Sequence, residues 1–359
     1  YTGTIKIKTA DLTNITNLQL NTSGGILSPS VLGNKTSPNS FSLYIIGTEL
    51  AKLDGLLELS FTEKVLISNA TTLQLARTLR LIVLNYADVS GTIGNLPNAL
   101  PSTKTATVSL QQFNTVSGDL STMPPSYYRI NIAGDNTISG NISNLQSQVE
   151  SFNILGKNTL TGNLSTIPNS YTSGTVTSSV LREFAVLGYN TISGNIRELD
   201  IARIVTVNIA GEENPATPGI GGNSVSGTIN TSVGDTRSWN TTMGIFQVLG
   251  KNTITGNINA FSACTALQRI AVDGKLGFSL GNTISGNLSS LPAAPLLNRL
   301  ILNGNTSITG NLSSLSGLSA LQTVSFTGSN TVSGDISSLP KSIYSFTAEG
   351  LDRKSTRLN

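Results

Sequence analysis

A short motif, Asn-Thr-Ile-Ser-Gly-Asn-Ile with small variations, recurs ten times along this chain of 359 residues and constrains its fold more than any other feature. The central glycine of the motif stands at ten positions, 22 to 33 residues apart: Gly91, Gly118, Gly140, Gly162, Gly194, Gly227, Gly256, Gly286, Gly310 and Gly334. One unit repeated at this period is typical of a solenoid, in which each repeat forms a coil and stacked coils bury a shared core.

The residues around the motif glycine alternate between apolar and polar. An aliphatic residue stands two positions before and two positions after the glycine in all ten copies, as Ile192 and Ile196 do around Gly194. This spacing of two, with many β-branched residues and with hydroxyl or amide side chains between them, predicts a strand with one buried face. A second apolar alternation that ends in glycine, such as residues 184–188, precedes the motif. Each coil is therefore expected to contribute two strands.

An asparagine lies four positions before the motif glycine in eight of the ten copies. The eight are Asn114, Asn136, Asn158, Asn190, Asn223, Asn252, Asn282 and Asn330. By the same alternation these amides point inward, where burial is costly unless their donors and acceptors are paired. Stacked coils can pair them with the backbone of their own coil and of the next, so we predict a structural asparagine ladder.

The unit reads Leu300-Ile301-Leu302-Asn303-Gly304-Asn305, then Ile308-Thr309-Gly310-Asn311-Leu312 and Leu315. It resembles a leucine-rich repeat, most of all the plant-type variant in which L-S-G-x-I-P adds a second strand. The resemblance covers about residues 75–350 and implies a mostly β, leucine-rich-repeat-like solenoid with two short parallel sheets and little helix. A right-handed parallel β-helix of similar coil length is the alternative. Consensus leucines are often Ile, Val or Phe and cysteine-rich caps are absent, which favours a bacterial or phage origin.

Three regions follow from the extent of the repeat. Residues 1–74 lack the motif, although Leu18-Gln19-Leu20-Asn21 and Leu57-Glu58-Leu59-Ser60-Phe61 look like strands, and we expect an N-terminal cap or degenerate coils there. Residues 75–350 form the ten-copy solenoid. Residues 351–359 break the composition of the chain and resemble translated adapter sequence, so we expect this tail to lie outside the native fold. The alternative is a basic anchoring tail.

The composition excludes most catalytic chemistry. The chain has no His, which removes the commonest general base, the His-dependent nucleophile systems and imidazole zinc sites. Its one cysteine, Cys264, can form neither an intrachain disulfide nor a thiolate cage, and its small apolar neighbours predict a buried packing role. With 22 Lys and Arg against 19 Asp and Glu there is no basic patch for nucleic acid, and no apolar run reaches the length of a membrane helix. We expect no enzyme activity, no cofactor, no metal site, no nucleic-acid partner and no membrane insertion.

The leading functional hypothesis is a non-enzymatic structural or adhesive protein on a cell or virion surface. Its partner would be another copy of the chain, in a homo-oligomer or filament, or a surface protein or glycan. Three leucines on the outer face of the first-strand sheet, Leu155, Leu187 and Leu249, are candidate contact residues for such an interface.

Two alternatives use other surfaces. In the first, the inserted loops at 212–222 and 232–243 bind a host protein or glycan through Trp239, Arg237 and Glu212, since specificity is often carried on loops. In the second, the exposed hydroxyls of the second strands bind ice, because they resemble the threonine ladders of antifreeze solenoids. Those hydroxyls fall in two expected rows: Thr115, Thr137, Thr159, Thr191, Thr253, Thr283 and Thr331, beside Ser117, Ser139, Thr161, Ser193, Ser226, Thr255, Ser285, Thr309 and Ser333.

Overall fold

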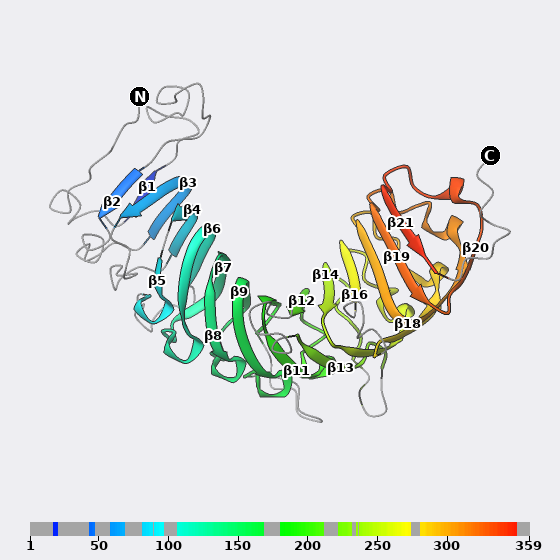
Figure 1. Cartoon of the computed structure of the whole chain (residues 1–359), viewed down its shortest axis with the longest axis horizontal. Coiled ribbons are helices and arrows are strands. Elements are labelled where there is room, and N and C mark those ends of the chain that lie inside the picture. Colours follow the sequence, from blue (N-terminus) through cyan, green and yellow to red (C-terminus); the bar gives the residue numbers. More distant parts are fainter. Residues whose placement is uncertain are drawn as a thin grey trace, which may run out of the picture. The chain divides into compact units, whose positions relative to one another are not determined.

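A computed structural model describes residues 17–20, 43–46, 58–68, 81–88, 90–96, 106–168, 180–211, 222–231, 235, 237–273 and 281–349. The chain divides into two compact units, residues 1–160 and 161–359. Both units are built from parallel strands, and within each unit successive coils place their strands side by side (Figure 1). No helix in the described segments is long and apolar enough to cross a membrane.

The first strands of the coils form one parallel sheet in each unit. In the first unit they are β1 Asn17–Leu20, β2 Leu43–Ile46, β3 Glu58–Ser68, β4 Leu81–Asp88, the first part of β6 Ala106–Asp119, β7 Tyr127–Gly134 and the first part of β9 Ser151–Asn163. In the second unit they are β10 Glu183–Gly188, β12 Thr206–Gly211, β14 Ile245–Leu249, β16 Arg269–Asp273, the first part of β18 Arg299–Asn311, β19 Thr323–Gly328 and β21 Ser345–Ala348. Both segments predicted as strand-like before residue 74 fall on strands, β1 and β3, which pair in parallel.

The motif itself forms the second strands and a short turn. These strands are β5 Ser90–Thr92, the last parts of β6, β9 and β18, β8 Thr137–Asn141, β11 Thr191–Asn195, β13 Ser224–Thr228, β15 Thr253–Asn257, β17 Thr283–Asn287 and β20 Thr331–Ser333. Single 3-10 turns follow them: η2 Ile93–Asn95, η3 Leu120–Thr122, η4 Ile142–Asn144, η5 Leu164–Thr166, η6 Ile196–Glu198, η7 Ile258–Phe261, η8 Leu288–Ser290, η9 Leu312–Leu315 and η10 Ile336–Ser338. The residue after the motif glycine caps most of these turns, as Asn163 does by accepting the Ser165 backbone N–H at 2.9 Å.

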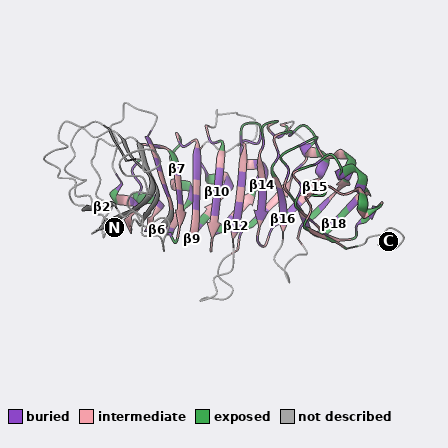
Figure 2. Ribbon diagram, turned by 90° about the horizontal axis from the view of Figure 1, so that it is seen from above, coloured by how far each residue is buried: buried purple, intermediate pink, exposed green. Residues whose placement is uncertain are grey.

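The core lies between the two strands and the turn of each coil. Buried and half-buried residues alternate along β19, whereas β14 and β16 each have three consecutive buried residues, and Figure 2 shows both classes on the first strands. In one coil Phe246 and Val248 of β14 and Ile254 of β15 are completely buried. Burying each side chain of this size contributes roughly 1.5–3 kcal/mol, so the stacked coils, and not any single coil, supply the stability.

Neighbouring second strands are staggered by two residues. Thr191 of β11 pairs with Thr161 at the end of β9, and Ser193 pairs with Asn163. The same offset relates β17 to β15, where Thr283 pairs with Thr255. A residue three positions before the motif glycine therefore lies beside the residue one position before the glycine of the previous coil. The prediction of two separate rows of hydroxyls is wrong in this respect. Each row across the sheet places a residue three positions before one motif glycine next to a residue one position before the preceding motif glycine.

Candidate functional site

The asparagines four positions before the motif glycine are buried, each with at most 3% of its surface exposed. In six of them the side-chain oxygen accepts the backbone N–H of the residue two positions before the glycine of the preceding coil, at 2.8–3.0 Å. The pairs are Asn136 with Val116, Asn158 with Ile138, Asn223 with Ile192, Asn252 with Val225, Asn282 with Ile254 and Asn330 with Ile308. Asn114 and Asn136 also donate to a carbonyl of the next coil, Ala133 O at 3.4 Å and Leu155 O at 3.3 Å. These amides hold coils together and are not available to a ligand.

The outward hydroxyls of the second strands fall into two kinds. Those three positions before the motif glycine are exposed, as Thr253 and Thr283 are. Those one position before it are half-buried in most coils and donate to the carbonyl of the preceding motif glycine at 3.3–3.5 Å: Ser117, Ser139, Ser193, Ser226, Thr255, Ser285 and Thr309. These seven hydroxyls thus form hydrogen bonds within the fold itself.

The outer face of the first-strand sheet in the second unit carries two arginines side by side. Arg269 of β16 and Arg299 of β18 are register partners, so their side chains leave neighbouring strands at the same level. Neither forms an ion pair within the described part of the chain. The Nε atom of Arg269 is buried and has no hydrogen-bond partner among the described residues. Burial and the nearby Arg299 both lower the pKa of Arg269.

Amides organise the surroundings of Arg269. Its Nη1 donates to Gln247 Oε1 at 3.0 Å, and Gln247 Nε2 donates to Asn208 Oδ1 at 2.9 Å. Gln247 is buried although it lies on the outer face, so this chain of bonds fixes the guanidinium above β14. Arg129 occupies a similar position in the first unit but differs in being paired, since its Nη2 and Nε lie 2.8 and 3.0 Å from Glu150 Oε2.

The predicted leucine contacts lie on the same outer face but do not form a run. Leu187 pairs in register with Ala210, and Ala210 pairs with Leu249, so an alanine separates the two leucines. Both leucines are half-buried, as is Leu155 of the first unit. The sequence-based prediction for this face omitted the row that holds Arg269 and Arg299. The alternation of outward residues in each strand extends to this row, so the sequence contained the information needed to predict it.

The inserted loop at 232–243 turns inward at Trp239. The indole is 3% exposed and packs against Phe246 and Phe261, with ring centroids 5.1 and 5.5 Å away. Its Nε1–H donates to Ile229 O at 2.8 Å. Trp239 is thus a packing residue in the described structure and not an exposed contact residue. Glu212 lies outside the described residues.

Trp239 takes the place of a missing 3-10 turn. In other coils the residue five positions after the motif glycine donates its N–H to the carbonyl two positions after the glycine, as Leu199 does to Ile196 at 3.3 Å. Residues 229–231, which follow Gly227, are not helical, and the indole N–H serves the Ile229 carbonyl instead. The sequence signal was available, because this copy alone lacks an apolar residue five positions after its glycine.

Arg237, the other described member of the loop prediction, belongs to an ion-pair cluster. Its Nη2 and the Nη2 of Arg197 lie 2.9 and 2.8 Å from Asp235 Oδ2. Hydrogen bonds from Arg237 hold the pKa of the Asp235 carboxyl well below its usual range, against the opposing effect of burial. Arg197 Nη2 also donates to Arg237 O at 3.0 Å. The cluster holds two guanidinium groups and one carboxylate, and so carries a net positive charge.

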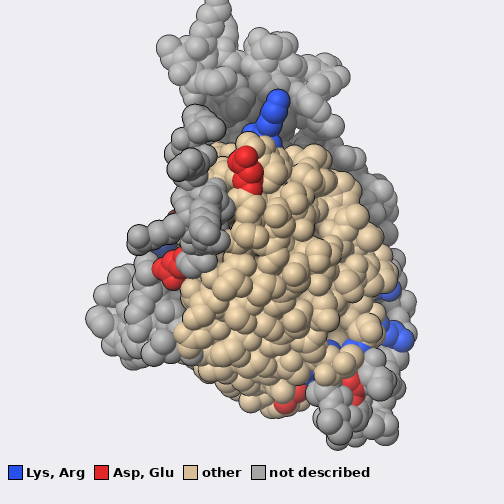
Figure 3. Space-filling view, turned by 90° about the vertical axis from the view of Figure 1, so that its right-hand side faces the viewer, with Lys and Arg blue, Asp and Glu red and all other residues tan. Residues whose placement is uncertain are grey.

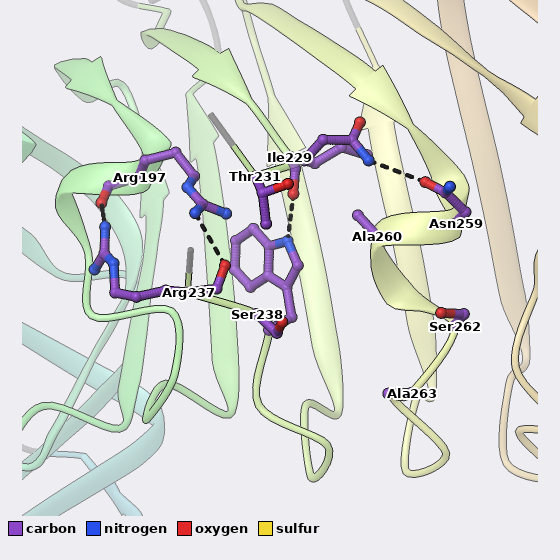
Figure 4. Close-up of a pocket in the computed structure, with 11 residues that line it drawn as sticks. Arg197, Ile229, Thr231, Arg237, Ser238, Asn259, Ala260, Ser262 and Ala263 are labelled. Atoms are coloured by element: carbon purple, nitrogen blue, oxygen red, sulfur yellow. Dashed lines mark hydrogen bonds between the residues drawn. The ribbon is translucent and has the colours of Figure 1, made fainter. Parts of the chain in front are cut away.

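A pocket of about 250 Å³ lies beside this cluster, between η6 and η7. Figure 4 shows Arg197 and Arg237 on one side of it and Asn259, Ala260, Ser262 and Ala263 on the other. Trp239, Ile229, Asn230, Thr231 and Ser238 complete its lining.

Charged side chains are otherwise sparse. Seen from the right-hand side of Figure 1, the molecule presents a broad surface of uncharged residues with only a few Lys, Arg, Asp and Glu in view (Figure 3). Within the described ranges, no three His, Cys, Asp or Glu side chains come together in a way that could hold a metal ion.

Comparisons with known proteins identify the fold. No protein-family model and no curated protein matches the sequence. Among solved structures, the chain is similar to the LRR ectodomain of the plant membrane receptor kinase GASSHO1/SCHENGEN3 from Arabidopsis thaliana, in complex with CASPARIAN STRIP INTEGRITY FACTOR 2. The TM-score is 0.50 and the identity 21%, over 94% of this chain and 36% of that one.

A second similar structure is the Arabidopsis receptor kinase HAESA in complex with the peptide hormone IDA and the co-receptor SERK1. The TM-score is 0.51 and the identity 18%, over 87% of this chain and 48% of that one. The chain thus spans less than half the length of either ectodomain. The architecture is a leucine-rich-repeat-like β solenoid, as the motif predicted, and the leucine-rich-repeat interpretation holds over the parallel β-helix alternative.

Proposed function

We propose that this chain is a non-enzymatic recognition and adhesion protein that acts outside the cell, at a cell or virion surface. We further propose that it binds an acidic segment of a protein partner on the outer face of the first-strand sheet in the second unit. The observation that carries the proposal is the pair formed by Arg269 and Arg299, which are register partners without an acidic partner among the described residues.

Placing two like charges opposite each other in a sheet destabilises the fold unless a counter-charge is supplied. In the first unit the fold supplies one, because Glu150 pairs with Arg129. In the second unit it does not, and the buried Nε of Arg269 is left with an unused donor. A carboxylate from a partner would satisfy that donor, and charge-assisted bonds to guanidinium groups are among the stronger polar contacts.

The fold comparisons support a protein partner by analogy alone. Both similar ectodomains were solved in complex with a protein or peptide. The low charge of the chain and its single cysteine favour a surface role over a catalytic one. Self-association into oligomers or filaments stays a prediction, which sedimentation of the purified chain would test.

Selection from a random peptide display library on the immobilised chain tests the proposal. We expect enrichment of sequences rich in Asp and Glu, followed by at least tenfold weaker binding when Arg269→Gln and Arg299→Gln are combined. A tenfold loss corresponds to about 1.4 kcal/mol, within reach of two charge-assisted hydrogen bonds. Arg129→Gln is the matched control and should leave binding unchanged. Enrichment without acidic residues, or full affinity in the double variant, would contradict the proposal.

A further inference from the structure

The pocket beside Trp239 is a consequence of one irregular coil. Everywhere else in the described solenoid a 3-10 turn follows the second strand, but residues 229–231 form none. The space between η6 and η7 is only partly filled by the indole of Trp239, and about 250 Å³ stays open to the surface. The coil without a 3-10 turn thus forms a concavity between η6 and η7.

One wall of the pocket presents an unused cationic donor. Arg197 is 6% exposed, and its Nε and Nη2 are occupied by Asp235, at 2.9 and 2.8 Å. Its Nη1 is buried and has no acceptor among the described residues. Figure 4 shows the guanidinium group of Arg197 directed toward Thr231, which also lines the pocket. A buried cationic N–H without a partner costs free energy, and an anionic ligand group would recover it.

The charge around the pocket also favours an anion. Asp235 is shared between Arg197 and Arg237, so these three side chains bring together two guanidinium groups and one carboxylate. Because the pKa of Asp235 is held low, protonation of that carboxyl does not alter this balance near neutral pH. A carboxylate at Arg197 Nη1 would pair the remaining donor of that guanidinium group without breaking its bonds to Asp235.

The remaining walls combine hydroxyl, amide and apolar groups. Thr231, Ser238, Asn259 and Ser262 are exposed and surround the opening, so that they offer both donors and acceptors. The Trp239 indole with Ala260 and Ala263 gives an apolar wall. A pyranose ring has the complementary pattern, with hydroxyls at its edge and C–H groups on its faces. The volume is below the roughly 300–1,000 Å³ of sites for drug-sized ligands, which suits a single ring.

The geometry points to a binding site for one carboxylate-bearing sugar, a uronic acid unit of a polysaccharide. Its carboxylate meets Arg197 Nη1, its hydroxyls meet the amide and hydroxyl rim, and one ring face lies toward Trp239. The site is separate from the arginine pair at 269 and 299, and it does not depend on the function proposed for that pair.

Trp239 is the only tryptophan of the chain, so its fluorescence reports directly on the pocket. The titration uses the full chain with D-glucuronate, and with D-glucose, acetate and N-acetyl-aspartate as comparisons. We expect a saturable fluorescence change with glucuronate and at least tenfold weaker binding of both glucose and acetate. No saturable change with glucuronate would overturn the proposal. Equal binding of acetate would reduce the site to a simple anion site, and equal binding of N-acetyl-aspartate would make it a peptide site, so either result also overturns it.

Two variants locate the binding without disturbing the ion-pair cluster. Ala263→Phe places a ring over the opening from an exposed turn and should weaken glucuronate binding at least tenfold. Gly317→Phe is the matched control, because Gly317 holds the equivalent place in the turn after η9 and a Cβ atom there would have no neighbouring atom within 4 Å. The control should bind glucuronate as the native chain does. Native affinity in Ala263→Phe, with native circular dichroism, would overturn the assignment.

Discussion

The side-chain oxygen of Asn163 occupies the place that a side chain at Gly194 would need. A Cβ atom built on Gly194 would lie 2.4 Å from Asn163 Oδ1 and 2.8 Å from the backbone nitrogen of Leu164. Gly194 also has a φ of 109°, which L side chains rarely adopt. Asn163 caps η5 of its own coil, and the stagger of β11 brings the glycine of the next coil over that cap. The Gly-Asn pair of the motif is therefore explained by contact between successive coils.

Replacing Gly194 by alanine should destabilise the second unit by about 2–4 kcal/mol, because both backbone strain and a clash with the cap must be relieved. Urea denaturation followed by circular dichroism measures the free energy of unfolding. Gly317→Ala is the control, since nothing lies within 4 Å of its Cβ position, and it should change stability by no more than about 0.5 kcal/mol. Equal stability of the two variants would contradict the cap explanation.

The asparagine ladder makes a second prediction. Asn223→Ala removes the acceptor that lies 3.0 Å from the Ile192 N–H and leaves that donor buried. An unsatisfied buried donor and the small cavity together should cost about 2–4 kcal/mol, measured by the same denaturation. Asn131→Ala, on the outer face of β7, should cost less than about 0.5 kcal/mol. A similar small loss at both sites would mean that the ladder contributes little.

The alternation of apolar and polar residues was enough to predict two strands per coil and the inward position of the asparagines. It could not predict the stagger of the second strands. A shift of two residues leaves every side chain on the same face, so alternation cannot distinguish it from perfect alignment. The stagger brings Gly194 against Asn163, and this contact joins two different coils, so the pattern within one coil does not contain it.

The candidate site was harder to predict for the same reason. Arg269 and Arg299 are 30 residues apart, and they become neighbours only when the register of β16 and β18 is known. Trp239 was predicted to be a contact residue because specificity is often carried on inserted loops. Its burial depends on a space that only the missing turn at residues 229–231 provides.

Cys264 should be unreactive in the folded chain. It is fully buried, and burial raises the pKa of its thiol to about 11, so the thiolate is scarce at neutral pH. We expect Ellman's reagent to label the native chain at least a hundred times more slowly than the chain in denaturant. Rapid labelling of the native chain would show that the turn after η7 opens readily.

The ion-pair cluster predicts how stability depends on pH. The folded pKa of Asp235 lies below its unfolded value of about 3.9, so its contribution is present above that pH and is lost as the pH falls toward the folded pKa. Asp235→Asn should be less stable than the native chain at pH 6, and the difference should shrink at pH 3. Asp135→Asn is the control, because Asp135 belongs to an exposed pair with Lys157 and should matter little at either pH. A difference at Asp235 that stays constant with pH would contradict the assignment.

The indole N–H of Trp239 replaces a backbone donor, and two substitutions distinguish this hydrogen bond from the aromatic packing of the ring. Trp239→Phe keeps an aromatic ring against Phe246 and Phe261 but removes the bond to Ile229 O, which is 2.8 Å long in the native chain. We expect a loss of about 1–3 kcal/mol, from an acceptor left unpaired in a buried place. Trp239→Leu removes the same bond and the aromatic contacts as well. Its free energy of unfolding should fall by a further amount of about 0.5–1.5 kcal/mol, which is the typical strength of an aromatic pair. Urea denaturation followed by circular dichroism measures the stability of both variants, because neither keeps a tryptophan whose fluorescence could be followed. Native stability in Trp239→Phe would show that the Ile229 carbonyl does not need the indole.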